Sequence, residues 1–215
     1  MSAGIQEKNT SYLHTNTYVT LNELTDETTH IWLVFHGMGY LSKYFIHYFT
    51  GLDPQKHYVI SPQAPSKYYQ DSTFKRIGAS WLTRENTKQE TANIMNYIDA
   101  IYEAEIKNSN KKLVLLGYSQ GVSIVTRWLA HSKVDCSHLV LHSGGIPTEL
   151  VASDFMFLDD QTAVKLIYGT TDPYINEERL QEQKEIAQTL FPHHLTIVPF
   201  EGAHVVNEEA INNLI

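Results

Sequence analysis

Six short, mostly apolar runs recur along the chain, at residues 31–35, 58–60, 113–116, 139–141, 164–168 and 195–198. The first of them, Ile31 to Phe35, is apolar without interruption, which is typical of a strand buried on both faces of a parallel sheet. Segments with helical spacing separate most of the runs. The pattern therefore predicts an α/β fold, with a doubly wound, mostly parallel sheet flanked by helices.

The helical segments are marked by caps and by apolar spacing. Ser42 is expected to cap a helix that extends to about Phe49, and Asn176 a helix that extends to about Leu190. Thr87 to Glu90 fits a capping box ahead of a long helix. One face of that helix is apolar and consists of Ile94, Met95, Ile98, Ile101 and Tyr102. A short helix is expected at the end of the sequence.

Three further segments lack such spacing. Residues 11–24 mix apolar residues with threonines and predict a short antiparallel hairpin at the edge of the sheet. Residues 61–85 have little periodicity and predict a long surface loop, a kind of segment that is commonly functional. Residues 146–163 are too few for a helical cap domain. We therefore expect a single α/β domain over residues 1–215, without a large lid.

The run at 113–116 leads into Gly117-Tyr118-Ser119-Gln120-Gly121. A Gly-x-Ser-x-Gly pattern alone arises by chance in about one chain of this length in fifteen. Here an apolar strand precedes it, and apolar residues at helical spacing follow it. Strand, sharp turn and helix are the setting of a nucleophile elbow, in which the serine hydroxyl stands clear of the backbone. Ser119 is therefore the candidate nucleophile.

A serine needs a base, and the base needs a carboxylate to orient it. Functional residues of a parallel α/β sheet lie beyond the carboxyl ends of its strands. Of the eleven histidines, His204 follows the final strand on a glycine-containing turn, and His142 is the next candidate. Asp172 follows the strand at 164–168, although Asp172-Pro173 also fits a simple turn. The order Ser119, Asp172, His204 is that of an α/β-hydrolase.

His36-Gly37-Met38-Gly39 follows the first strand, where this fold supplies one amide of the oxyanion hole. The backbone N–H groups of Met38 and Gln120 are the candidate donors. A simple turn between strand and loop is the alternative. Around this site, Tyr40, Tyr44 and Trp81 are expected to border a shallow acyl cleft.

With these motifs the chain resembles the carboxylesterase, lysophospholipase and acyl-protein thioesterase group of α/β-hydrolases, over about residues 31–206. The resemblance rests on the motifs at residues 35–39, 117–121, 169–172 and 202–204. It implies a catalytic triad of Ser119, Asp172 and His204. The sequence departs from the group at Val122, which replaces a frequent glycine, and at Tyr40 and Thr83, which replace acidic residues. The substrate is therefore not taken from the resemblance.

Composition and charge narrow the possible partners, location and cofactors of the protein. The 215 residues are 42% apolar and carry a formal net charge of −8, which argues against nucleic acid as a partner. Cys136 is the only cysteine, no apolar run has the length of a membrane span, and the first eight residues lack the apolar core of a signal peptide. We expect a cytoplasmic protein. Nucleotide and zinc motifs are missing from the sequence, so neither a cofactor nor a metal is expected.

The sequence thus predicts a serine hydrolase that cleaves carboxylic esters of small or short-acyl substrates, with thioesters as a related substrate class. An amidase or peptidase with the same triad is one alternative. A catalytically silent binding protein on the same fold is the other. The oligomeric state is left open.

Overall fold

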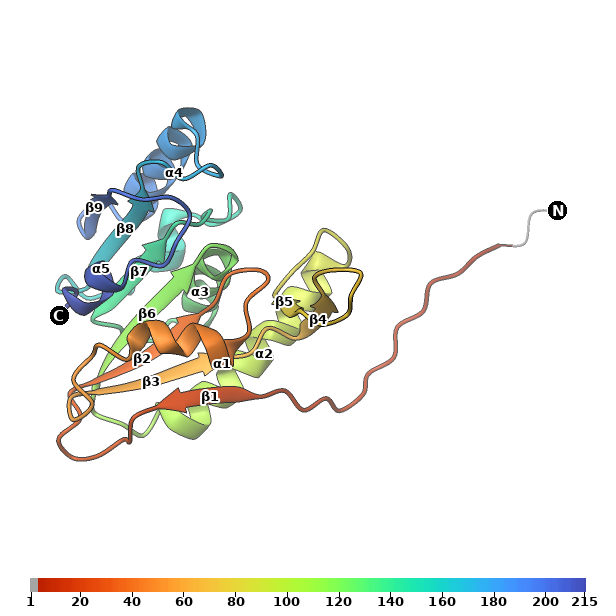
Figure 1. Ribbon diagram of the computed structural model, residues 1–215, viewed down its shortest axis with the longest axis horizontal. Helices are drawn as coiled ribbons and strands as arrows, with labels where there is room; N and C mark the ends of the chain where they lie inside the picture. The colour runs from red at the N-terminus through yellow and green to blue at the C-terminus, as the bar shows by residue number, and fades with distance from the viewer. Residues whose placement is uncertain (1–3) are drawn as a thin grey trace.

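A seven-stranded sheet forms the centre of the computed structural model, which describes residues 4–215 (Figure 1). The strand order is β1-β3-β2-β6-β7-β8-β9. The strands are β1 (Tyr18–Leu21), β2 (His30–Phe35), β3 (His57–Pro62), β6 (Lys112–Tyr118), β7 (His138–His142), β8 (Ala163–Gly169) and β9 (Leu195–Phe200). β1 pairs antiparallel with β3, and every other neighbouring pair is parallel. The predicted sheet is confirmed, and all six apolar runs lie in its parallel strands.

Helices cover both faces of this sheet. They are α1 (Ser42–Phe45), α2 (Thr87–Glu105), α3 (Gln120–Ser132), α4 (Glu177–Leu190) and α5 (Glu208–Asn212), with the 3₁₀ helices η1 (Ile46–Phe49) and η2 (Ala152–Phe155). One core cluster joins α2, α3 and α4 to the sheet, and a second joins α1, η1 and α5 to its other face. In β2, Leu33 belongs to the first cluster and Trp32 and Val34 to the second. This burial on both faces explains the uninterrupted apolar run.

The predicted hairpin at residues 11–24 is wrong. Only β1 forms in this segment, and its partner is β3 rather than a neighbouring strand. Residues 4–17 contain no helix or strand and extend away from the sheet (Figure 1). The side chains of Tyr12 and Leu13 are exposed, because nothing in the segment pairs with them. The expectation of no signal peptide falls partly on residues 1–3, which lie outside the described residues.

The predicted surface loop at 61–85 contains a second, two-stranded antiparallel sheet. It consists of β4 (Ser66–Tyr69) and β5 (Ile77–Ser80). All four residues of β4 are exposed, so the strand carries no apolar alternation that the sequence could have revealed. The small sheet is tied to the turn after β2, since the Gly39 N–H donates to the Ala79 carbonyl at 2.8 Å.

The helix caps match the predictions in one of three cases. Asn176 caps α4 as predicted, and its side chain accepts a hydrogen bond from the Arg179 N–H. For α1 the capping position is Leu41, while the Ser42 hydroxyl donates to Gln63 Oε1. The predicted capping box of α2 is wrong, because Asn86 occupies the capping position without a side-chain bond.

The connection between β7 and β8 carries only the single 3₁₀ turn of η2, so no helical cap covers the sheet there. Across residues 4–215, no helix combines the length and apolar character needed to cross a membrane. A cytoplasmic location stays a prediction.

Candidate active site

Ser119 is the single residue that connects the end of β6 to the start of α3. Its backbone conformation (φ 53°, ψ −117°) is one that non-glycine residues rarely adopt. The two motif glycines permit this turn. A Cβ at Gly117 would collide with the Gly121 carbonyl oxygen, and one at Gly121 would collide with the Phe35 carbonyl oxygen. Strand and helix therefore approach too closely for any side chain at either position. The strained serine is held at the apex, as the motif predicted.

Ser119, Asp172 and His204, which follow β6, β8 and β9, meet at one point. His204 Nε2 lies 3.0 Å from Ser119 Oγ, and His204 Nδ1 lies 2.6 Å from Asp172 Oδ2. The second carboxylate oxygen of Asp172 accepts the Tyr174 N–H at 2.9 Å, and the carboxylate has no solvent exposure. Since the Asp172 oxygen accepts from Nδ1, the Nε2 lone pair of His204 faces the serine hydroxyl.

Aromatic side chains hold the His204 loop in place. The Tyr118 hydroxyl donates to the His204 carbonyl at 3.0 Å, and the Tyr174 ring meets the His204 ring edge-on at 4.9 Å.

His142, the second candidate base, makes its hydrogen bonds to groups other than Ser119. Its Nε2 accepts the Asn207 N–H at 3.0 Å, and burial lowers its pKa to about 3. It anchors the loop that carries His204 and has no free lone pair for Ser119.

The turn after β2 is shaped by His36, which is fully buried. Its Nε2 accepts the Ala64 N–H at 3.1 Å, so its Nδ1 carries the proton and donates to the Gly37 carbonyl at 2.8 Å. Burial lowers the pKa of His36 to about 4, which keeps the ring neutral. Among the described residues, neither the Met38 N–H nor the Gln120 N–H has a hydrogen-bond acceptor. Two free amides thus flank Ser119.

The side chain of Gln120 has a second role that sequence reasoning missed. Its Oε1 accepts the Trp81 N–H at 2.8 Å, and its Nε2 donates to the Leu82 carbonyl at 2.7 Å. These bonds fasten the segment after β5 to the nucleophile elbow. The motif drew attention to Gln120 for its backbone amide, but nothing in the sequence identified residues 81–82 as its partners.

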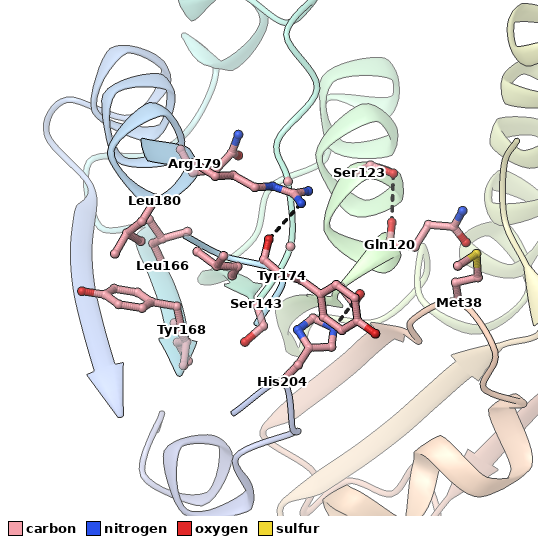
Figure 2. A pocket seen from close by; sticks show the side chains of 16 residues that line it. Met38, Gln120, Ser123, Ser143, Leu166, Tyr168, Tyr174, Arg179, Leu180 and His204 are labelled. Atoms are coloured by element: carbon pink, nitrogen blue, oxygen red, sulfur yellow. Dashed lines mark hydrogen bonds between the residues drawn. The ribbon is translucent and has the colours of Figure 1, made fainter. Parts of the chain in front are cut away.

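A cavity of about 460 Å³ opens beside Ser119 (Figure 2). Its walls come from the elbow, the turn after β7, the end of β8 and the first half of α4. Leu166, Tyr168 and Leu180 supply apolar surface, and Arg179 and Gln183 supply polar groups. The sequence identified none of these five, although the position of α4 directly after Asp172 was a usable signal.

The predicted pocket residues Tyr40, Tyr44 and Trp81 do not line this cavity. Trp81 is 1% exposed in the core, where its Nε1 donates to the His36 carbonyl. Tyr40 packs edge-on against Tyr118 within the second core cluster. Tyr44 points to solvent from α1. The pocket prediction is corrected accordingly: the Trp81 and Tyr40 rings serve packing, the Tyr44 ring is exposed, and the cavity lies on the α4 side of Ser119.

A family model described as Phospholipase/Carboxylesterase matches residues 16–215. The chain belongs to this family. It is a hydrolase, and the resemblance noted in its sequence is confirmed. No curated protein is detectably similar to it in sequence.

Solved structures show the same fold as this phospholipase/carboxylesterase family member. Acyl-protein thioesterase 2 from Zea mays aligns over 93% of this chain and 96% of its own, with 14% identity and a TM-score of 0.65. The Bacillus cereus carboxylesterase aligns over 92% and 90%, with 18% identity and a TM-score of 0.66. A phospholipase/carboxylesterase from Dyadobacter fermentans aligns over 96% and 99%, with 19% identity and a TM-score of 0.63.

Proposed function

We propose that the protein is a serine esterase that cleaves carboxylic esters through an acyl-enzyme intermediate, with Ser119 as nucleophile, His204 as base and Asp172 as the group that orients His204. The observation that carries this proposal is the unbroken hydrogen-bond chain from Ser119 through His204 to Asp172. A serine hydroxyl becomes reactive when such a base accepts its proton.

In the first step, Ser119 Oγ attacks the ester carbonyl carbon while its proton moves to His204 Nε2. The tetrahedral intermediate collapses when the carbon–oxygen bond to the alcohol breaks, and His204 returns the proton to the departing alkoxide. His204 then deprotonates a water, which attacks the acyl carbon. The second tetrahedral intermediate collapses when the bond from that carbon to Ser119 Oγ breaks, and His204 returns the proton to Oγ, so that the carboxylic acid and free Ser119 are released.

The oxyanion of each intermediate is stabilised by the backbone N–H groups of Met38 and Gln120. These amides have no acceptor among the described residues, so they need not break an existing bond to bind the oxyanion. A single donor of this kind lowers the barrier by about 3 kcal/mol. The buried, neutral His36 preserves the turn that presents the Met38 amide.

The substrate is a small or short-acyl ester. The cavity of about 460 Å³ opens beside Ser119, and the connection after β7 carries only η2, so no helical cap is present there to cover a long acyl chain. Each buried methylene contributes about 0.8 kcal/mol, so kcat/KM is expected to rise over short acyl chains and then level off. Thioesters are a second expected substrate, because their cleavage passes through the same tetrahedral intermediate. The fold shared with a protein described as an acyl-protein thioesterase is consistent with this.

Hydrolysis of a series of soluble esters tests the proposal. Ser119→Ala is expected to remove the activity, because the attacking group is lost. Ser123→Ala is the matched control, since Ser123 lines the same cavity but its hydroxyl donates to the Gln120 carbonyl. It should retain most of the activity. If Ser119→Ala hydrolyses esters like the wild type, the proposal is wrong.

A further inference from the structure

Arg179 reaches from α4 into the cavity that contains Ser119 (Figure 2). Arg179 is an exposed residue, and its Nη1 donates to the Tyr174 carbonyl at 3.0 Å, which favours a guanidinium position beside the cavity. The start of α4 is itself fixed, because the Asn176 side chain accepts the Arg179 N–H at 2.8 Å. The backbone N–H and the guanidinium of Arg179 therefore both bond to the loop that also carries Asp172.

Among the described residues Arg179 has no acidic partner, although the protein has a formal net charge of −8. Within residues 4–215, no carboxylate oxygen lies within 4.0 Å of its guanidinium nitrogens. The nearby Asp172 is unavailable, since one oxygen accepts from His204 and the other from Tyr174. In the described part of the chain the only side-chain hydrogen bond of Arg179 is made by Nη1, so its Nε and Nη2 groups have no acceptor there. These two parallel N–H groups match the two oxygens of a carboxylate.

Gln183, one turn further along α4, adds a donor to the same wall of the cavity. It is 8% exposed, and its Oε1 accepts the Ile146 N–H at 2.6 Å. That bond fixes the orientation of the amide, which leaves the Nε2 group without an acceptor among the described residues. Arg179 and Gln183 thus place two donor groups on the same wall of the cavity.

Gly145 keeps the space in front of these donors open. A Cβ at this position would lie 3.6 Å from Arg179 Nη2 and 4.0 Å from Gln183 Oε1. Its φ lies outside the left-handed region, so the backbone does not require glycine here. The missing side chain leaves room for a ligand group beside the guanidinium.

We infer that the ester substrate carries a carboxylate at a distance from its scissile bond, and that Arg179 binds this carboxylate through its Nε and Nη2 donors. Leu166 and Leu180 provide apolar surface for the short carbon spacer between the two groups. The inference rests on the proposed esterase activity of Ser119. It makes the preferred substrates esters that carry a carboxylate on the acyl or the alcohol side, rather than neutral esters.

Two pairs of substrates test this specificity, each an acid and its amide isostere. Monomethyl glutarate and the methyl ester of glutaramic acid place the charge on the acyl side. Acetoxyacetate and acetoxyacetamide place it on the alcohol side. The readout is the ratio of kcat/KM for the acid to kcat/KM for the amide, measured by pH-stat.

In the wild type we expect a ratio above 1 for at least one pair, and that pair identifies the side of the ester that faces Arg179. Arg179→Gln should lower this ratio by about 10- to 100-fold, the size of a lost charge-assisted hydrogen-bond pair. Arg179→Lys should restore it in part. Lys88→Gln, which removes the same charge from the exposed face of α2, is the matched control and should leave the ratio as it is.

An equal loss on the acid and the amide would show that Arg179 only supports the Tyr174 loop, and would overturn the inference. So would ratios that Arg179→Gln leaves unchanged in both pairs. If the wild type hydrolyses none of the four esters, the proposed esterase function fails instead. In that case, titration of Ser119→Ala protein with glutarate still tests the site: binding that disappears in Ser119→Ala/Arg179→Gln supports it, and undiminished or absent binding overturns it.

Discussion

Asp172 shows how the bonds of one side chain set the proton position on another. Its oxygens accept hydrogen bonds from His204 Nδ1 at 2.6 Å and from the Tyr174 N–H at 2.9 Å. An aspartate oxygen only accepts, so Nδ1 must carry the proton and Nε2 must be the acceptor that faces Ser119. The same reasoning fixes the neutral tautomers of His36 and His142, each of which accepts a backbone N–H at Nε2.

Replacing Asp172 with Asn is therefore expected to damage the chemistry and not the fold. The amide would present an N–H to His204 Nδ1, favour the wrong tautomer and fail to stabilise the imidazolium, so kcat for a neutral ester should fall by on the order of 10⁴-fold. Circular dichroism checks that the fold is intact. Asp160→Asn, an exposed acid between β7 and β8, is the control and should keep the wild-type kcat. A loss of only a few-fold in Asp172→Asn would show that another acid orients the histidine.

At the scale of elements, the features that depend on burial were predictable from the sequence. Four of the six strands could be located because β2, β3, β6 and β7 are almost entirely buried and leave continuous apolar runs. β8 and β9 are only partly buried, but they also carry short runs of mostly apolar residues. β4 and the edge position of β1 could not be located in the same way, because their residues are exposed or half-exposed. The triad was predictable for a different reason: its chemistry restricts both the residue types and their order along the chain.

The pocket was not predictable from aromatic composition. Trp81 and Tyr40 were expected in the pocket because of their rings, yet Trp81 belongs to the first core cluster and Tyr40 packs against the second. The cavity is instead lined by Leu180 and Arg179, which depend on where α4 starts after Asp172. That placement is a property of three-dimensional packing and has no periodic signature.

The link between Gln120 and residues 81–82 supports a prediction at this scale. Gln120→Ala leaves the backbone amide at 120 in place but removes the partners of the Trp81 N–H and the Leu82 carbonyl. The free energy of unfolding, measured by urea denaturation, should fall by about 1–3 kcal/mol because these groups lose their bonds. Gln89→Ala, on the exposed face of α2, should change it by a few tenths of a kcal/mol at most. If both variants are equally stable, the link does not contribute.

For the whole molecule, buried histidines connect stability to pH. His30, His36 and His142 are at most 8% exposed. Burial lowers their pKa values to about 4, about 4 and about 3, from 6.5. Between pH 6.5 and these values the unfolded chain binds more protons than the folded one. The contribution of these histidines to the free energy of unfolding is therefore fully present above about pH 6.5, and it is lost as the pH falls toward 4.

Urea denaturation at pH 7.5, 6.5 and 5.5 measures this loss. Each of these histidines contributes at most about 1.4 kcal/mol per pH unit below pH 6.5. His30→Gln should make the dependence shallower, because one of the groups is removed. His47→Gln is the control at an exposed position and should leave the slope as in the wild type. A free energy of unfolding that stays constant from pH 7.5 to 5.5 would contradict the account.

The central claim is that Ser119 is a nucleophile activated by His204. Peptide mass spectrometry after reaction with a fluorophosphonate tests it most directly, because the reagent forms a stable bond only with an activated serine. The account predicts one phosphonyl group, which fragmentation of the labelled peptide assigns to Ser119 and not to Ser123, and a labelling rate that falls by orders of magnitude in His204→Ala. Labelling of Ser123 or Ser143 instead, or an unchanged rate in His204→Ala, would contradict it.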